Sequence, residues 1–434
     1  MDFNLSAEQL RFREQVRAWV ASALPKAPKP PRSRHGEPPA SMRERYQTWQ
    51  RMRYDGGMTC VLWPQEYGGR GLGVVEHYIV SSEVDTLPVA PPINVVGFGM
   101  CLPLILHVGT PAQKARLLPP AARGEAVWCQ LFSEPGCGSD LAALKTRAEP
   151  EGKGWRLTGQ KIWNSFAHHA DFGICLARTD PRASKHRGLT MFLLNMRQKG
   201  VTVRPIPFSN GDHDFNEVFL DNAWVDGADV LGEVNEGWSV AIGTLMIERG
   251  TSNIHVLFRP WVDRVLALAK ERLAADPPGL GAHVARAEVA RLMTHAKVLE
   301  LQGLRTLFGA ASGAPPGPEG SFVKLLWSET NQRLAALALD ILGPAGALLD
   351  GDEAVPDDGW YPRNWLRSFG NTLEAGSSEI LRNIMAERIL GLPKDASRAP
   401  IAQAAIALAP LAQAPAQPAA PRTPEAHPVP EARR

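Results

Sequence analysis

The feature that most constrains this chain is a change of hydrophobic periodicity along it. Apolar residues recur at helical spacing over residues 1–125 and again over 237–395. Between them, residues 126–236 carry short β-type runs, among them 172–177 and 190–194, separated by Gly, Asp and Pro turns. Apolar residues at helical spacing do not fall on one face of a strand, and apolar residues at strand spacing do not fall on one face of a helix. The sequence therefore predicts an N-terminal helical domain at 1–125, a compact β-domain at 126–236 and a second helical domain at 237–395.

The ends of the chain carry further signals. Ser6 and Gln9 stand at capping-box spacing and open an expected helix over 6–24. At the other end, residues 396–434 form an Ala/Pro-rich tail that has little to pack and is expected to be disordered. Two stretches rich in Gly, Pro and acidic residues are expected to be surface loops: 312–320 and 350–362.

Composition excludes several classes of function. The chain has 47 basic and 45 acidic side chains, so no global field recruits nucleic acid or an anionic membrane. Five scattered cysteines without a CxxC pair indicate a reducing, cytoplasmic setting. We expect neither a signal peptide nor a membrane-spanning segment, because the first helical stretch carries charges and no apolar run approaches the length of a span. No metal is expected, because His168-His169 lacks a third ligand at a sensible spacing.

Two segments of the β-domain carry residues suited to binding a ligand. Residues 128–140 resemble a strand that ends in a Pro-Gly-x-Gly-Ser turn, which exposes backbone N–H groups and a hydroxyl. An ordinary tight turn is the alternative interpretation. In 159–165, Trp163 and Ser165 occupy outward positions of a β-segment, although Trp163 on its own is more typical of a core residue.

These segments gain meaning together with three more, and in this order and spacing the set resembles the acyl-CoA dehydrogenase family. The resemblance covers about residues 1–393, with bacterial members acting on dicarboxylic or unusual acyl-CoAs the most similar in texture. It implies an α+β fold with an N-terminal helical domain, a middle β-barrel-like domain and a C-terminal four-helix bundle. The five segments are Trp128–Asp140, Gly159–Ser165, Leu231–Trp238, Ile247–Gly250 and Gly376–Pro393.

The resemblance also implies FAD as the cofactor, held between the last two domains. Trp163 and Ser165 are expected to cover the isoalloxazine ring, and Ser377 and Glu379 to approach the ribityl or diphosphate portion at a helix N-terminus. Residues 340–346 match the loop that reaches the neighbouring subunit's FAD, but lack its glutamine and one glycine. The expected cofactor-binding residues are Ser133, Gly138, Ser139, Trp163, Ser165, Ser377 and Glu379, and the expected substrate contacts are Ser139 and Arg249.

Dehydrogenation needs a carboxylate to remove the α-proton, on the side of the substrate opposite the flavin. Many relatives carry it immediately before the glycine of the Gly376 motif, where this chain has Ala375. A subset that includes isovaleryl-CoA and long-chain enzymes carries it in a Glu-Arg pair, which Glu248-Arg249 matches. We therefore expect Glu248 to be the base. Glu374 is the alternative base, and the alternative role for Glu248 is a solvated helix charge.

The expected activity is α,β-dehydrogenation of an acyl-CoA to the trans-2-enoyl-CoA, with electrons passed to an electron-transfer flavoprotein. An acyl-CoA oxidase or monooxygenase on the same fold is a second interpretation. A third is one subunit of a heteromeric dehydrogenase, suggested by Ala375 and the altered 340–346 loop. The oligomer is accordingly expected to be a homodimer, a homotetramer or a heterotetramer, and the acyl group stays open.

Overall fold

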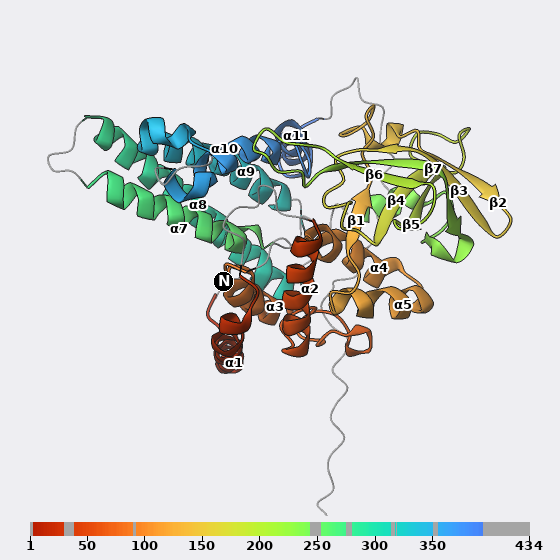
Figure 1. Cartoon of the computed structure of the whole chain (residues 1–434), viewed down its shortest axis with the longest axis horizontal. Helices are drawn as coiled ribbons and strands as arrows, with labels where there is room; N and C mark the ends of the chain where they lie inside the picture. The colour runs from red at the N-terminus through yellow and green to blue at the C-terminus, as the bar shows by residue number, and fades with distance from the viewer. Residues whose placement is uncertain are drawn as a thin grey trace, which may run out of the picture.

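The computed structural model describes residues 3–29, 39–89, 93–243, 253–274, 280–313, 317, 319–349 and 355–393. Helices gather at one end of the molecule and a β-sheet at the other, with the N-terminal helices below and between them (Figure 1). The predicted order of helical, β and helical regions is thus confirmed. The tail predicted to be disordered at 396–434 lies outside the described residues.

The N-terminal region is helical, as its periodicity predicts. The first helix begins at the expected capping box, in which the Ser6 hydroxyl accepts from Gln9 N and the Gln9 side chain accepts from Ser6 N. A second capping box, formed by Thr110 and Gln113, begins the last helix. The helices are α1 (Ala7–Ala23), α2 (Pro39–Asp55), α3 (Val74–Val80), α4 (Leu102–Val108) and α5 (Pro111–Ala122), with π-helical segments at Ser81–Asp85 and Gly97–Cys101.

The middle region forms one eight-stranded sheet in the order β6-β7-β3-β2-β4-β5-β8, with β1 paired in parallel to β4. Most neighbours are antiparallel, and β4 and β5 are buried along almost their whole length. The strands are β1 (Trp128–Leu131), β2 (Arg147–Glu151), β3 (Gly154–Lys161), β4 (Phe172–Arg178), β5 (Leu189–Asn195), β6 (Val201–Pro205), β7 (Asn216–Asp226) and β8 (Val230–Leu231).

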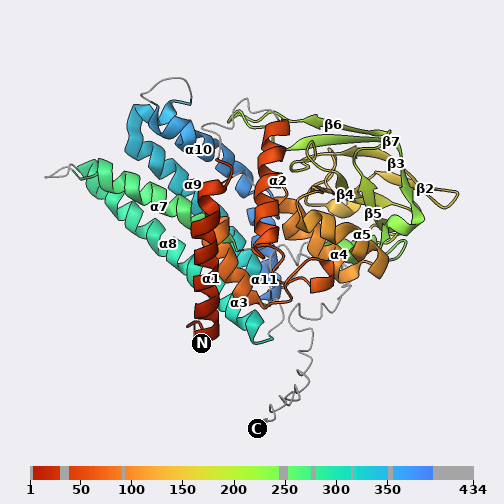
Figure 2. The same ribbon diagram turned by 60° about the horizontal axis from the view of Figure 1, so that its bottom comes forward.

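The C-terminal region is a helical bundle whose core is apolar and well packed. Its long helices run side by side away from the sheet, as two views of the molecule show (Figures 1 and 2). They are α7 (Ile254–Arg272), α8 (Leu280–Ala311), α9 (Glu319–Leu342), α10 (Trp360–Asn371) and α11 (Ser378–Arg388).

Both surface loops predicted in this region are shorter than expected. Helix α9 already begins at Glu319, inside the predicted loop at 312–320. Helix α10 begins at Trp360, inside the predicted loop at 350–362. For α10 the reason is amphipathicity, because Trp360 and Tyr361 pack on the bundle core and extend this helix toward its N-terminus. The remainder of each predicted loop lies partly outside the described residues.

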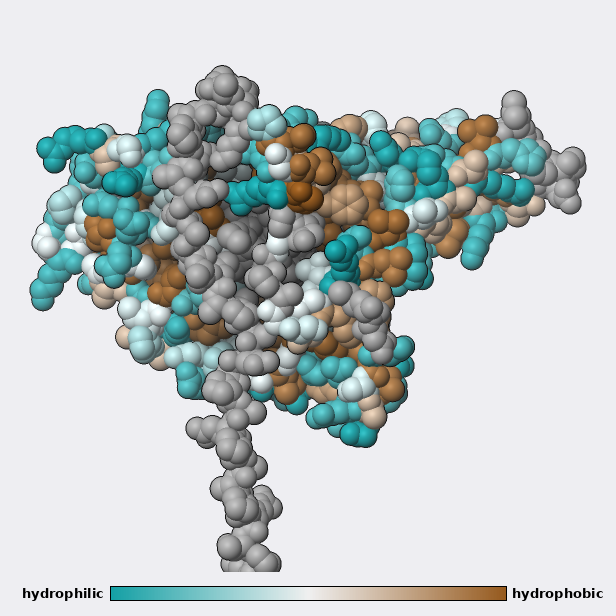
Figure 3. All heavy atoms as spheres, turned by 180° about the vertical axis from the view of Figure 1, so that it is seen from behind, coloured by the Kyte–Doolittle hydropathy of each residue, from teal (hydrophilic) through white to brown (hydrophobic). Residues whose placement is uncertain are grey.

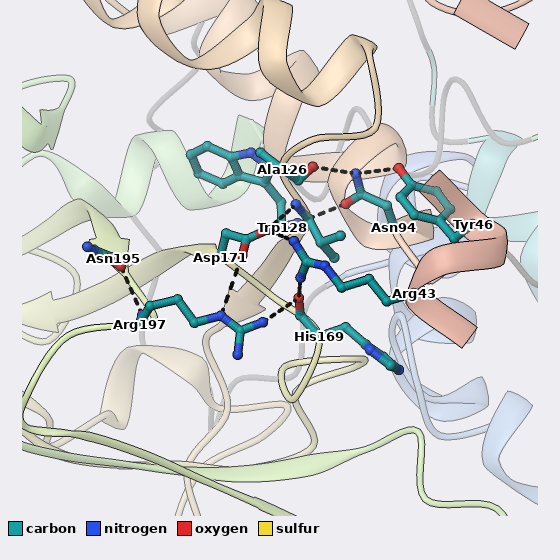
Figure 4. Close-up of polar contacts among 10 residues, drawn as sticks. Arg43, Tyr46, Asn94, Ala126, Trp128, His169, Asp171, Asn195 and Arg197 are labelled. Carbon is teal, nitrogen blue, oxygen red and sulfur yellow. Dashed lines mark hydrogen bonds and ion pairs between the residues drawn. The ribbon is translucent and has the colours of Figure 1, made fainter. Parts of the chain in front are cut away.

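Buried and half-buried polar groups fix the N-terminal helices to the sheet (Figure 4). The amide of Asn94 donates to Tyr46 Oη at 3.0 Å and its carbonyl accepts from Trp128 N at 2.9 Å. The Asp171 carboxylate accepts from Val127 N at 2.9 Å and pairs with Arg43 of α2 at 2.7 Å. Because these contacts hold both ends of the 126–128 connection, the start of β1 has a fixed place against α2.

Candidate active site

Trp163 stands in an exposed, unusual backbone position just beyond the end of β3. Its φ is 62° and its side chain is 56% exposed. Positive φ is a genuine outlier for a bulky residue, and such outliers gather at functional sites. Two expectations are therefore wrong: Trp163 is not a core residue, and it belongs to a turn rather than a strand, because β3 ends at Lys161.

Hydrogen bonds on both sides hold this turn in place. Ile162 N donates to Ser133 O at 2.9 Å, and Asn164 Nδ2 donates to Gln130 O at 2.8 Å. On the other side, Asn164 N donates to Asn216 O at 3.1 Å and Asn216 Nδ2 donates back to Asn164 O at 2.9 Å. Both asparagines are buried. The two segments singled out in the β-domain thus lie side by side, and their clamp supports the strained turn.

The turn after β1 has the form that its Pro-Gly sequence predicts. Glu134 and Cys137 exchange two backbone hydrogen bonds of 2.9 and 3.0 Å across Pro135-Gly136. Beyond it, Gly138 and Ser139 are exposed, while Ser133 and Ser165 are half-buried. Ser133 lies beside the turn of Trp163 and Ser165 through the backbone bond from Ile162 N to Ser133 O, and we refer to these three residues as the rim. Their cofactor contacts stay predictions.

A buried ion pair underlies the rim, and the sequence analysis missed it. Lys161 is fully buried, and its ammonium donates to Glu134 Oε1 at 2.9 Å, Phe132 O at 3.1 Å and Leu176 O at 2.8 Å. Glu134 also accepts from two backbone N–H groups of the 145–146 segment. Although burial raises the pKa of Glu134, the Lys161 charge and these donors outweigh it and hold that pKa below its usual value. The sequence signal that could have revealed the pair is one charged residue in each of two β-type segments, Glu134 after β1 and Lys161 at the end of β3.

The rim continues onto the C-terminal bundle through an aromatic contact. The rings of Trp163 and Phe215 meet edge to face, with centroids 6.3 Å apart. The Arg367 guanidinium of α10 lies over the Phe215 ring, 5.3 Å from its centroid. Nearby, Arg363 Nη1 donates to Asn210 O at 2.8 Å. Hence the connection between β6 and β7 contacts α10. The spacing of residues in the sequence does not predict this contact.

Glu374, the alternative base, is held by its own neighbours. Arg367 Nη2 lies 2.7 Å from Glu374 Oε2, and Asn371 Nδ2 donates to Glu374 Oε1 at 2.6 Å. Ala375 follows with a φ of 54°, so the chain turns sharply at the position where many relatives carry the base. Both oxygens of this carboxylate are therefore bound to cationic or amide donors of α10.

Ser377 and Glu379 begin α11, as expected, but each has a structural role there. The Ser377 side chain is the N-cap and accepts from Ile380 N at 3.4 Å. The backbone N–H of Glu379 and the Ser377 hydroxyl lower the pKa of the exposed Glu379 carboxyl. The hydroxyl of a capping serine still has a proton to donate, so a contact with FAD stays compatible with this arrangement.

Other predicted positions fall elsewhere. Glu248 and Arg249 lie outside the described residues. In the altered loop, α9 ends at Leu342 and a 3₁₀ turn follows over Gly343–Ala347. His168 and His169 lie in the turn between β3 and β4. Across the part of the chain that the structure describes, no three His, Cys, Asp or Glu side chains are grouped to hold a metal ion.

Comparison with known proteins shows to which family this chain belongs. Family models of the N-terminal, middle and C-terminal domains of acyl-CoA dehydrogenase match residues 6–125, 129–223 and 235–390. By class, the protein is an FAD-dependent oxidoreductase with the helical, sheet and helical fold of acyl-CoA dehydrogenation. The chain belongs to the acyl-CoA dehydrogenase family. Across the described ranges, no helix has the length and apolarity required to cross a membrane.

Individual relatives cover most of the chain. Acyl-CoA dehydrogenase IpdE1 of Mycobacterium tuberculosis is 36% identical over 89% of this chain and 98% of its own length. A solved structure described as the Tcur3481-Tcur3483 steroid ACAD is 26% identical, with a TM-score of 0.77, covering 91% of this chain and all of that one. The ChsE4-ChsE5 complex from Mycobacterium tuberculosis is 25% identical, with a TM-score of 0.74, over 91% of this chain and 100% of that one.

The residues present fit FAD. An exposed indole, fixed by a clamped turn at positive φ, offers a flat aromatic surface that a flavin ring can cover. The Ser133 and Ser165 hydroxyls beside it are suited to hydrogen bonds at the edge of such a ring. Bound FAD supplies the hydride acceptor of the family's reaction, and these residues would hold it.

This fit makes a direct prediction for Trp163→Ala. Because the indole is exposed, its loss should leave folding almost unchanged but weaken FAD binding about tenfold, the equivalent of an aromatic contact of ~1.4 kcal/mol. Flavin absorbance per chain after gel filtration measures the effect. Trp224→Ala, at the other end of the same sheet, is the matched control and should keep its flavin. Equal flavin content in both variants would argue against Trp163 as the flavin wall.

Proposed function

We propose that this enzyme removes the α-proton of an acyl-CoA thioester with Glu248 and delivers the β-hydride to bound FAD, giving the trans-2-enoyl-CoA. The observation that carries the assignment of the base is the state of Glu374. Arg367 and Asn371 hold both of its oxygens, and Ala375 stands where many relatives carry the base. With both oxygens already bound by neighbouring side chains, Glu374 is not free to approach a substrate proton, which leaves Glu248 as the candidate.

The remaining roles follow from the rim described above. Trp163 and Phe215 give one wall of the site and exclude water from it. Ser139, exposed beyond the turn after β1, is available to the thioester or the CoA chain. Arg249 is proposed to shape the substrate site next to the base. Elimination requires base and hydride acceptor on opposite faces of the substrate, so Glu248 is proposed to act from the side away from Trp163.

For the electron acceptor we favour an electron-transfer flavoprotein, the acceptor that the family resemblance implies, and a cytoplasmic setting. Reoxidation of the substrate-reduced enzyme distinguishes this from an oxidase. We expect stopped-flow reoxidation by an electron-transfer flavoprotein to be fast and reoxidation by air to be slow. Rapid reoxidation by air with release of hydrogen peroxide would instead favour the oxidase.

A second proposal concerns assembly: this chain is one subunit of a heteromeric dehydrogenase for steroid-derived acyl-CoAs. Two similar structures are described as a Tcur3481-Tcur3483 steroid ACAD and a ChsE4-ChsE5 complex. In addition, large apolar side chains are exposed where α10 and α11 end, which is typical of an interface. Apolar surface also gathers near the middle of the rear face, beside the grey atoms (Figure 3). The exposed residues are Phe369, Leu373, Ile389, Leu390 and Leu392.

Co-expression tests this assembly. We expect the chain expressed alone to hold less than one FAD per chain, and a second acyl-CoA dehydrogenase-like chain to restore the full complement in a stable complex. Flavin absorbance and light scattering after gel filtration measure both quantities. An unrelated dehydrogenase of similar size is the control. A yellow, active assembly of this chain alone would refute the heteromer while leaving the reaction proposal intact.

A further inference from the structure

A buried histidine lies in the first turn of α7 without hydrogen-bonding partners. His255 is only 8% exposed, and in the described part of the chain neither ring nitrogen has a hydrogen-bond partner. Nearly all buried polar side chains in folded proteins are hydrogen-bonded to protein or to ordered water, and each exception needs a reason. An imidazole with two unused nitrogens therefore marks a place where a polar ligand or a water molecule belongs.

Three helices from two parts of the chain build the surroundings of this ring. Tyr78 of α3 stacks on it, with centroids 5.9 Å apart and an interplanar angle of 15°. Gly303 of α8 faces its edge so closely that a Cβ there would lie 2.2 Å from His255 Nδ1. Two residues before His255 in the sequence, Asn253 Nδ2 lies 3.5 Å from His77 Nε2. The His255 imidazole thus lies where α3 of the N-terminal region meets α7 and α8 of the bundle.

The charge at this junction selects the chemistry of the ligand. Burial lowers the pKa of both His255 and His77, so both imidazoles are neutral at pH 7. A neutral imidazole offers one donor and one acceptor. The Glu300 carboxylate opposes the effect of burial at His255, so it is near enough to repel an anion. The site therefore suits a hydroxyl or a ketone oxygen and disfavours a carboxylate.

We propose that His255 binds a neutral oxygen of the acyl group, a hydroxyl or ketone remote from the thioester, and thereby selects oxygenated acyl-CoAs. The inference rests on the proposed function, and on the separation of Glu248 and His255 by seven positions in the sequence, which limits their distance to roughly 24 Å. That span fits a substrate whose α-carbon meets Glu248 while a distant ring or chain reaches the junction.

The test compares two acyl-CoAs that differ by one oxygen, such as 3-cyclohexylpropanoyl-CoA and its 4-oxocyclohexyl analogue. Isothermal titration of the holoenzyme gives both dissociation constants without requiring turnover. The wild type should bind the oxo compound more tightly. His255→Phe keeps the ring shape but removes both nitrogens, so it should weaken the oxo compound about tenfold, the value of one hydrogen bond, and change the parent less than twofold. His295→Phe on α8 is the control and should change neither constant.

Two outcomes would overturn the inference. Equal weakening of both compounds would show that His255 only supports the fold, and unchanged binding of both would show that the ring meets nothing but water. Gly303→Ala, which must displace the imidazole, should reproduce the selective loss and guards against a folding defect in the first variant. Failure of the proposed reaction would appear separately, as tight acyl-CoA binding without flavin bleaching in the wild type.

Discussion

Glu248→Gln should abolish bleaching of the flavin by acyl-CoA while FAD stays bound. Removal of a general base that acts in the transition state costs about 10²–10⁴-fold in rate, and glutamine keeps the size of the side chain without its basicity. Anaerobic titration with a panel of acyl-CoAs, followed by stopped-flow absorbance of the flavin, measures the loss. The dissociation constant of the product enoyl-CoA should change little, because the substitution affects proton transfer more than binding.

Glu374→Gln is the informative partner of this variant. Its carboxylate pairs with Arg367 at 2.7 Å, so the substitution should weaken the contact between Glu374 and α10 and leave bleaching within a few-fold of the wild type. If Glu374→Gln instead stops bleaching and Glu248→Gln does not, the assignment of the base is wrong and the loop around Ala375 is remodelled during catalysis. Loss in both variants would point to a site that depends on both carboxylates.

Local signals made most of the fold predictable from the sequence. The capping box at Ser6 and Gln9 fixed the start of α1, and the runs at 172–177 and 190–194 correspond to β4 and β5 within one residue at each end. These elements depend on neighbours in the chain, which a periodicity records. The start of α10 was missed because Gly, Pro and acidic residues dominate the sequence just before it, whereas Trp360 and Tyr361 pack on the bundle core.

The candidate site was less predictable, because its contacts join residues far apart in the chain. The contact of Phe215 with Arg367 spans the boundary between the sheet and the bundle, and no spacing rule connects them. The positive φ of Trp163 is likewise supported by Asn164 of the same turn, whose hydrogen bonds reach Gln130 of β1 and Asn216 of β7. Residue types identified the segments, but only tertiary structure shows that the indole is exposed.

The ion pair beneath the rim is the second place where a large effect is expected. Lys161 and Glu134 are 0% and 8% exposed, and neither bulk water nor salt screens their attraction fully. Removal of one partner leaves the other charge buried without compensation. Because Lys161 also donates to the carbonyls of Phe132 and Leu176, its ammonium ties β3 to the end of β1 and to β4.

Lys161→Met should therefore lower the free energy of unfolding by about 3–5 kcal/mol and reduce the flavin content, since the rim residues rest on this pair. Urea denaturation measures the first effect. In the double variant with Glu134→Gln, the uncompensated carboxylate is gone, so part of the lost stability should return. If the two losses simply add, the pair is not coupled as the structure indicates.

The same pair predicts an acid limb in stability. The folded-state pKa of Glu134 lies below that of a free glutamate, about 4.3, so its ionised form favours the folded protein above that pH. As the pH falls from about 4.3 through the folded-state pKa, the folded protein takes up a proton and this contribution is lost. Glu134→Gln should therefore be less stable than the wild type at pH 7 and should lose less stability below pH ~4. Parallel acid limbs in the two proteins would show that other carboxylates dominate the unfolding.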